Sequence, residues 1–376
     1  MEEKHQKHAK ITKKQNDTFA TNEVAILGTN CGIIANLVQN VSLKLSNYNL
    51  AYFDASHAKD VAQNTLTEYT FHQQGNLEIR TTSSVNKFEQ RLQFINHDLV
   101  FINGNHYQGA KQILILDTEK EASIEKRLDQ ITNIQFIIKR TSDVPYFDCL
   151  LEKFPQIKNI TCYEIDEIDK ITQHIENVIK EHIAPVKGLV LIGGKSTRMG
   201  TDKSELEYYG KPQKQHAKEL LESTLLETFY SVQTSSVQTS SVQASSDEIQ
   251  DTFLNLGPFS GICSAFQKDP NSAWLVLATD VPFVDKSLIK LLLEKRNPSK
   301  IATAIKGKNS EFPEPLITIY EPKAYTKLLQ YIAQGYSCPR KMLINSDIEI
   351  VEVDDNLIRN INTPEEFEMA KKMLEI

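Results

Sequence analysis

The sequence lacks the features that mark secreted disulfide-rich proteins, membrane proteins and general nucleic-acid binders. Its five cysteines are odd in number, scattered and never spaced as CxxC: Cys31, Cys149, Cys162, Cys263 and Cys338. That pattern disfavours a disulfide framework or a zinc site and suits reduced thiols in the cytoplasm. No apolar run approaches the ~18 residues that a membrane-spanning helix needs. With a formal net charge of −7, the basic face typical of nucleic-acid binders is not expected.

Basic residues are locally dense only in the first segment, "MEEKHQKHAKITKKQ". This segment has no apolar core, so it does not resemble a signal peptide. We expect residues 1–20 to form a disordered tail.

Apolar runs alternate with helical patterns twice along the chain, which predicts two three-layer α/β domains. The first domain spans 21–184, with strands expected in "EVAILG", "LAYFDAS", "HDLVFING", "QILILD" and "IQFIIKR". Its last helix places five apolar side chains on one face: Ile168, Ile171, Ile175, Val178 and Ile179. A short joint at 184–186 contains a proline, which disfavours a continuous helix.

The second domain, 186–376, is expected to be Rossmann-like with a mostly parallel sheet. Its strands are predicted in "VKGLVLI", "WLVLATDVPF", "KIATAIKG", "PEPLITIY" and "DIEIVEV". Thr363 and Pro364, followed by two glutamates, are typical of a helix start. Residues 231–246 repeat a five-residue, serine-rich motif, which favours a flexible loop over a strand.

A glycine loop follows the first strand of the second domain, in "GLVLIGGKSTRMGTDK". Gly193 and Gly194 lack Cβ atoms, so a ligand can approach their backbone closely. Lys195, Arg198 and Lys203 could then neutralise phosphate charge. The alternative is a tight strand-to-helix turn with surface cations.

Asp280 ends an apolar strand in "AWLVLATDVPF". Ligands collect at the carboxyl ends of strands in open α/β sheets, and one or two carboxylates with substrate phosphates typically hold Mg²⁺. Alternatively, Asp280 could be a helix N-cap. Together with the glycine loop, it predicts a metal–nucleotide site.

"LIGGKSTRMGTDK" resembles the signature of the molybdenum cofactor guanylyltransferases, the MobA family. The resemblance continues through "GKPQ", "GPFSGICSAF", "ATDVPF", "EPLITIY" and "NINTPEEF", and so covers 186–376. It implies transfer of GMP from GTP to molybdopterin-bound molybdenum, with release of pyrophosphate and Mg²⁺ as cofactor. It also implies partners among molybdoenzymes or cofactor-insertion proteins, with no nucleic acid and no membrane.

The resemblance also assigns roles to particular residues. Catalysis falls to Lys203, Asp280 and Arg198, with Asp280 as the magnesium ligand. The nucleotide would contact Leu191, Ile192, Gly193, Gly194, Lys203, Asp251 and Asp280. The pterin substrate would lie against Arg340, Asn360 and Asn362.

Three positions depart from the family pattern. Ile192 replaces a small residue before the glycine pair, and Glu314 stands where the family often has histidine. Near Ser231 the chain begins its serine-rich repeat where a nucleotide-binding asparagine is expected, which puts guanine selectivity in doubt. A related nucleotidyltransferase that uses CTP or a sugar phosphate, and a non-catalytic module that carries or inserts the cofactor, therefore remain alternatives.

The first domain contains a strand, a turn and a helix in the order of a P-loop. A working P-loop has lysine and a hydroxyl after its last glycine, but Gly32 is followed by Ile33 and Ile34. The element order resembles the molybdopterin-guanine adaptor, the MobB family. We expect an adaptor-like domain without nucleotide hydrolysis, in which His97 and His106 are surface or satisfied core histidines.

Overall fold

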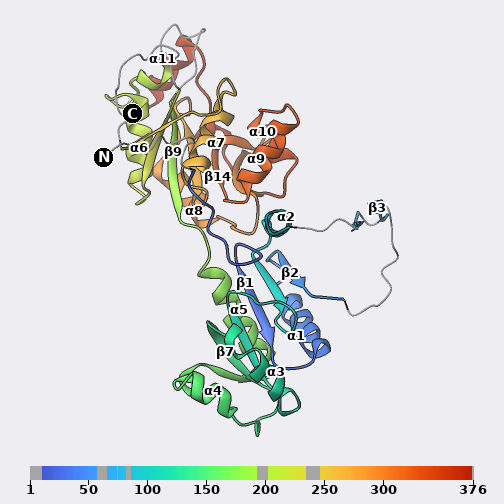
Figure 1. The fold of residues 1–376 in the computed structure, drawn as a ribbon. Coiled ribbons are helices and arrows are strands. Elements are labelled where there is room, and N and C mark those ends of the chain that lie inside the picture. Colours follow the sequence, from blue (N-terminus) through green and yellow to red (C-terminus); the bar gives the residue numbers. More distant parts are fainter. Residues whose placement is uncertain are drawn as a thin grey trace, which may run out of the picture. The chain divides into compact units, whose positions relative to one another are not determined.

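A computed structural model describes residues 11–56, 66–73, 75–81, 86–192, 202–233 and 246–374. It divides into two compact units. The N-terminal unit is Gln15–His182, and the C-terminal unit is Ile183–Ile376 together with the residues up to Lys14. Each unit is an α/β domain built on its own sheet (Figure 1).

The N-terminal unit contains a six-stranded sheet in which every pair is parallel. In sheet order its strands are β2 (Leu50–Phe53), β5 (Leu99–Asn103), β1 (Glu23–Leu27), β6 (Gln112–Leu116), β7 (Ile134–Lys139) and β8 (Cys162–Glu164). A parallel sheet is buried on both faces, which accounts for the uninterrupted apolar runs of its central strands.

Helices cover both faces of this sheet. The helices α1 (Cys31–Lys44) and α5 (Ile168–Lys180) pack on one face, and α3 (Glu121–Lys126) and α4 (Asp148–Lys153) pack on the other. The predicted apolar face of α5 is confirmed, because Ile171, Ile175, Val178 and Ile179 are buried while Ile168 packs against the same core.

Between β2 and β5 the chain forms elements that the sequence patterns did not predict. A hairpin of β3 (Glu68–Phe71) and β4 (Leu77–Arg80) has exposed residues throughout. It precedes helix α2 (Lys87–Phe94).

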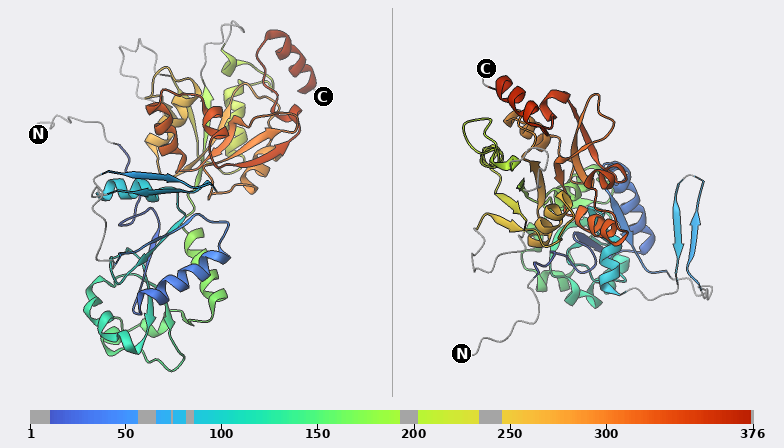
Figure 2. Two further views of the ribbon diagram at one scale, coloured as in Figure 1. Left: turned by 90° about the vertical axis from the view of Figure 1, so that its right-hand side faces the viewer. Right: turned by 90° about the horizontal axis from the view of Figure 1, so that it is seen from above.

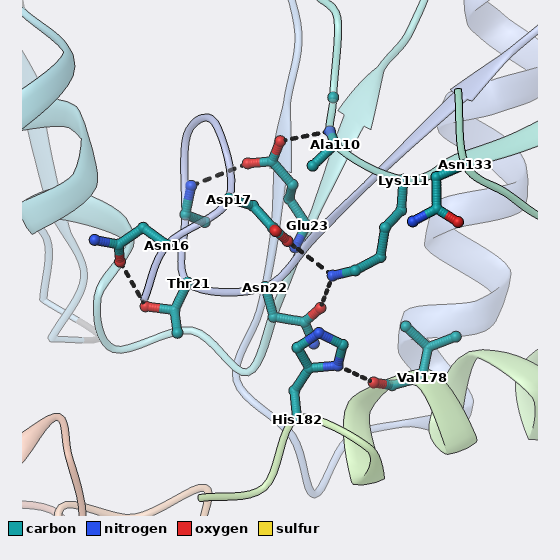
Figure 3. Close-up of polar contacts among 12 residues, drawn as sticks. Asn16, Asp17, Thr21, Asn22, Glu23, Ala110, Lys111, Asn133, Val178 and His182 are labelled. Atoms are coloured by element: carbon teal, nitrogen blue, oxygen red, sulfur yellow. Dashed lines mark hydrogen bonds and ion pairs between the residues drawn. The ribbon is translucent and has the colours of Figure 1, made fainter. Parts of the chain in front are cut away.

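The structure differs from the predicted tail at residues 15–20. The buried Glu23 carboxylate accepts hydrogen bonds from the backbone N–H groups of Phe19, Ala20 and Ala110. Lys111 donates to Asp17 at 2.7 Å and to Asn22 at 2.9 Å (Figure 3). These contacts tie the segment to the start of β1. Composition alone could not reveal the bonds of Lys111, because Asp17 and Asn22 lie about 90 residues away from it in the sequence.

The C-terminal unit contains a seven-stranded sheet. In sheet order its strands are β11 (Glu248–Gln250), β10 (Thr228–Val232), β9 (Val186–Ile192), β12 (Ala273–Ala278), β14 (Glu314–Tyr320), β13 (Ala302–Gly307) and β15 (Glu349–Val353). Only β14 runs antiparallel to its neighbours β12 and β13, and the other pairs are parallel. The mostly parallel sheet predicted for this half is therefore confirmed.

Two layers of helices enclose this sheet (Figures 1 and 2). On one face lie α7 (Pro258–Lys268), α9 (Ala324–Ala333) and α10 (Pro339–Ile344), around a core that includes Trp274 and Phe266. On the other face lie α6 (Gln213–Glu222) and α8 (Lys286–Glu294). The last helix, α11 (Pro364–Leu374), packs on a small separate cluster.

An almost fully buried ion pair holds the start of β9. Arg296 donates to both carboxylate oxygens of Glu321 at 2.7 Å and to the Ala184 carbonyl at 2.8 Å. The Glu321 side chain is only 2% exposed, so the pair fixes the residues just before Val186.

Among the residues that the structure describes, no helix combines the length and the apolar character that crossing a membrane requires.

Candidate active site

Three predicted site residues from distant parts of the sequence meet at the carboxyl end of β12. The Lys203 ammonium group donates to Asn362 Oδ1 at 2.7 Å and lies 3.7 Å from Asp280 Oδ2. Both charged side chains keep some solvent access, at 20% for Lys203 and 26% for Asp280. A carboxylate and a cation are thus presented together at the edge of the sheet where α/β proteins bind ligands.

The turn before α11 fixes Asn362 beside the strand end. The Asp280 carbonyl accepts a hydrogen bond from Ile361 N at 2.8 Å, while Ile361 packs with Tyr208 and Phe367. The Glu366 carboxylate accepts from the N–H groups of Asn362 and Thr363, and the Thr363 hydroxyl accepts from Glu366 N. This reciprocal cap agrees with the predicted helix start.

Asp280 does not cap the helix that follows it. The N-cap of α8 is Asp285, whose carboxylate accepts from Leu288 N at 2.8 Å. The alternative interpretation of Asp280 as an N-cap is therefore wrong, since a second aspartate closer to the helix performs that role.

The environment of Asp280 suits a bound cation. Burial raises the pKa of this carboxyl group, and the nearby Lys203 charge opposes the rise without cancelling it. Its Oδ1 atom is buried and makes no hydrogen bond within the described part of the chain. Because an unpaired buried carboxylate oxygen is costly, a divalent cation at this position would satisfy it.

A second carboxylate, Glu314, faces the same edge. Since β14 runs antiparallel to β12, its first residue lies where β12 ends: Leu277 pairs with Ile317, and Asp280 and Glu314 each lie three residues further toward that edge. Burial raises the pKa of Glu314; the Arg340 guanidinium lowers it and the Asp280 charge raises it further.

Arg340 is held by this glutamate. Its Nη2 donates to both oxygens of Glu314, at 3.0 and 3.2 Å, while the side chain stays 43% exposed. The Arg340 Nε atom is buried without a hydrogen-bond partner among the described residues. Arg340, which we predicted to contact the pterin, is therefore held by Glu314 at the same edge of the sheet as Asp280.

Asp251 directly follows β11, the outermost of the parallel strands on the far side of β9 from β12. Its buried carboxylate accepts from the Ser231 hydroxyl of β10 at 2.7 Å, and burial raises its pKa despite that bond. Leu191 is buried in the core, and in the sheet it pairs with Ser231 of β10 and Ala278 of β12. Ile192 ends β9 and is half-buried.

Not every predicted site residue joins this group. Gly193, Gly194 and Arg198 lie outside the described residues, as do Lys195 and most of the 231–246 repeat. Asn360 is exposed on the turn next to Ile361.

The sequence alone marks Glu314 only as a departure from the family pattern. The connection between β13 and β14 is short, and short connections join antiparallel strands. This signal could have shown that β14 runs in the opposite direction and begins at the edge where Glu314 lies.

Comparisons with known proteins concern mainly the C-terminal half. Residues 188–348 match the family model described as "MobA-like NTP transferase domain". A "Molybdenum cofactor biosynthesis bifunctional protein" from Synechocystis is 33% identical over 49% of this chain and 53% of its own length. A "Probable molybdenum cofactor guanylyltransferase" from Natranaerobius thermophilus is 29% identical over 50% of this chain and 96% of its own length.

A solved structure of Bacillus subtilis MobB is also similar, with 14% identity, a TM-score of 0.29, and coverage of 40% of this chain and 96% of that one. The chain spans about half the length of the Synechocystis relative. The resemblance of the C-terminal half to the guanylyltransferases is confirmed, and so is a nucleotidyltransferase domain.

Proposed function

Starting from a C-terminal half that is a MobA-like NTP transferase domain, we propose that the protein transfers GMP from GTP to molybdopterin-bound molybdenum. The products are pyrophosphate and the molybdopterin guanine dinucleotide cofactor. The observation that carries the proposal is the convergence of Lys203, Asp280 and Asn362 at the carboxyl end of β12.

Each charged residue has a separate task in this reaction. Lys203 binds the GTP phosphates and stabilises the charge that develops on the departing pyrophosphate. The hydrogen bond to Asn362 keeps the Lys203 ammonium group beside Asp280, so this cation is already oriented before the nucleotide binds. Such preorganisation lowers the barrier because little reorganisation is needed in the transition state.

Asp280 would hold Mg²⁺ through Oδ1, which is buried and lacks a partner among the described residues. When bound, Mg²⁺ supplies positive charge to the α-phosphoryl oxygens and orients the phosphates. The chain needs no nucleophilic side chain, because a phosphate of the acceptor attacks the α-phosphorus in line with pyrophosphate.

The acceptor is an anion, and Arg340 is the cation that faces it. Glu314 fixes the guanidinium through Nη2, and the half-exposed remainder of the group is left to bind acceptor phosphate. Asn360 and Asn362 would border the same region.

A nucleotidyltransferase that uses CTP is the second candidate. The observation that favours it is Ser231, which lies near the place where the guanine-family pattern has asparagine and donates its hydroxyl to Asp251.

The decisive experiment is a nucleotide panel. The protein is incubated with molybdopterin-bound molybdenum, Mg²⁺ and each NTP in turn, and pyrophosphate release is measured. We expect GTP to give the highest kcat/KM. A preference for CTP would overturn the guanine assignment, and absence of transfer with every nucleotide would support the non-catalytic module.

A further inference from the structure

The turn that resembles a P-loop in the N-terminal unit carries a cysteine–histidine pair instead of a lysine. Cys31 Sγ lies 3.3 Å from His106 Nε2, and the same nitrogen lies 3.7 Å from Asp54 Oδ1. The Cys31 side chain is half-buried, and His106 is 19% exposed. The His106 imidazole therefore lies close to both the Cys31 thiol and the Asp54 carboxylate.

The topology explains why these residues meet. The strands β2, β5 and β1 are neighbours and parallel, so their carboxyl ends lie at one edge. Asp54 follows β2, His106 follows β5, and Cys31 follows β1 as the first residue of α1. At Gly28, φ is +101° and an added Cβ would lie 2.3 Å from the Ile115 carbonyl, so the turn that leads to Cys31 requires glycine.

Asp54 is fixed as a charged group facing the imidazole. Burial alone would raise the pKa of this carboxyl group, but hydrogen bonds from Asn103, Tyr52 and Ala55 N outweigh it and hold the pKa below its usual value. A carboxylate beside His106 stabilises the imidazolium that forms when the ring accepts a proton.

Asn105 lies beside the pair and carries an unpartnered oxygen. Its amide nitrogen donates to the Thr29 carbonyl at 2.7 Å and lies 3.8 Å from Cys31 Sγ. The other end of the amide, Oδ1, is buried and has no hydrogen-bond partner within the described residues. A buried carbonyl oxygen normally has a partner, and a donor on a bound molecule would provide one.

Among the described residues, two other charged groups near the pair bond elsewhere. Arg127 donates to the Asn105 carbonyl at 2.6 Å, and Asp117 accepts from the Thr29 hydroxyl at 2.6 Å. The Tyr52 hydroxyl is occupied by Asp54, and burial together with that carboxylate raises its pKa. His106 is thus the group placed to act as base.

We propose that Cys31 is a nucleophilic thiol, activated by His106, that forms mixed disulfides with low-molecular-weight disulfides. His106 Nε2 accepts the proton from Cys31, and the thiolate attacks one sulfur of the disulfide. One S–S bond forms as the other breaks, and the departing thiolate takes the proton from His106. The helix N-terminus adds to the stabilisation of the thiolate.

The other cysteines provide an internal comparison. Burial raises the pKa of Cys263 to about 12 and also raises that of Cys149, which makes both poor nucleophiles. Cys338 is exposed and serves as the reference for an accessible thiol.

The test uses the full chain, reduced and then exposed to oxidised glutathione at neutral pH, with initial rates of mixed-disulfide formation measured at each cysteine by peptide mass spectrometry. We expect Cys31 to react on the order of tenfold faster than Cys338, because His106 is placed to accept the thiol proton as the Cys31 sulfur attacks. His106→Gln should remove this advantage and leave the rate at Cys338 unchanged. His97→Gln, which alters another histidine of the same unit, should change neither.

Asp54→Asn provides a second variant, expected to slow Cys31 partially, and circular dichroism checks the fold of each protein. In denaturant the rates at Cys31 and Cys338 should become similar, as the pair is then separated. The proposal is overturned if folded wild-type protein modifies Cys31 no faster than Cys338. It is equally overturned if folded His106→Gln retains the wild-type rate at Cys31.

Discussion

At the scale of single residues, the two aspartates that follow β12 have different environments. Asp280 carries a buried, unpartnered oxygen within the described structure, whereas Asp285 caps α8. The two residues have the same chemistry, lie five positions apart in the sequence and differ only in what they contact. They therefore form a matched pair for mutation.

Asp280→Ala should lower the rate of nucleotidyl transfer by on the order of 10²-fold or more. Without this carboxylate, Mg²⁺ is no longer held where it would stabilise the charge on the reacting phosphates. Asp285→Ala should leave kcat near the wild-type value and lower the free energy of unfolding by about 1 kcal/mol, as loss of an N-cap does. Steady-state kinetics and urea unfolding of both variants check this. Normal turnover and magnesium dependence in Asp280→Ala would show that the metal site is wrong.

The raised pKa of Asp280 also predicts a dependence of stability on pH. Since the folded protein binds this proton more tightly than the unfolded chain, ionisation of Asp280 costs stability as pH rises through its pKa. Asp280→Asn should therefore have a higher Tm than the wild type at pH 7, without nucleotide or metal. The difference should shrink as pH falls toward the ordinary range of a carboxyl group, near pH 4, and a Tm series over pH measures it.

At the scale of secondary-structure elements, the Arg296–Glu321 ion pair that holds the start of β9 is expected to be sensitive to mutation. Arg296→Ala leaves the Glu321 carboxylate buried without its cation, and breaking a buried pair in this way costs about 3–5 kcal/mol. Lys300→Ala removes a surface pair with Asp347 and should cost at most about 1 kcal/mol. Urea unfolding compares the two, and equal small losses would mean that the start of β9 is held by other contacts.

Most strands were predictable from the sequence because buried strands leave continuous apolar runs. "VKGLVLI" and "PEPLITIY" indeed form β9 and β14. The antiparallel direction of β14 could not be predicted from its apolar run, because such a run does not show which way its strand runs relative to its neighbours. The position of Glu314 depends on that direction and could not be predicted from the run either. The hairpin of β3 and β4 escaped prediction because its residues are exposed and carry no burial pattern. Lys203 and Asp280 were identified through a motif, but their contact with Asn362 depends on how α11 packs.

At the scale of the whole molecule, only the C-terminal unit is expected to bind nucleotide. In the N-terminal unit Ile34 is fully buried in the core and Ile33 is half-buried, in the places where a P-loop has its lysine and hydroxyl. Titration of the full chain with labelled GTP should give one site per chain. Lys203→Ala should abolish micromolar binding, and a second saturable site that survives this change would show that the N-terminal turn still binds phosphate.

The bond between Lys203 and Asn362 joins residues 159 positions apart, and this separation has a consequence for protein synthesis. Ribosomes deliver the chain from its amino end, so Lys203 and Asp280 emerge well before the turn that orients the lysine. A chain that ends between residues 354 and 361 contains every strand of the sheet but lacks Asn362. Activity should therefore appear only after the last strand has been made, and a chain that ends in this interval should be inactive.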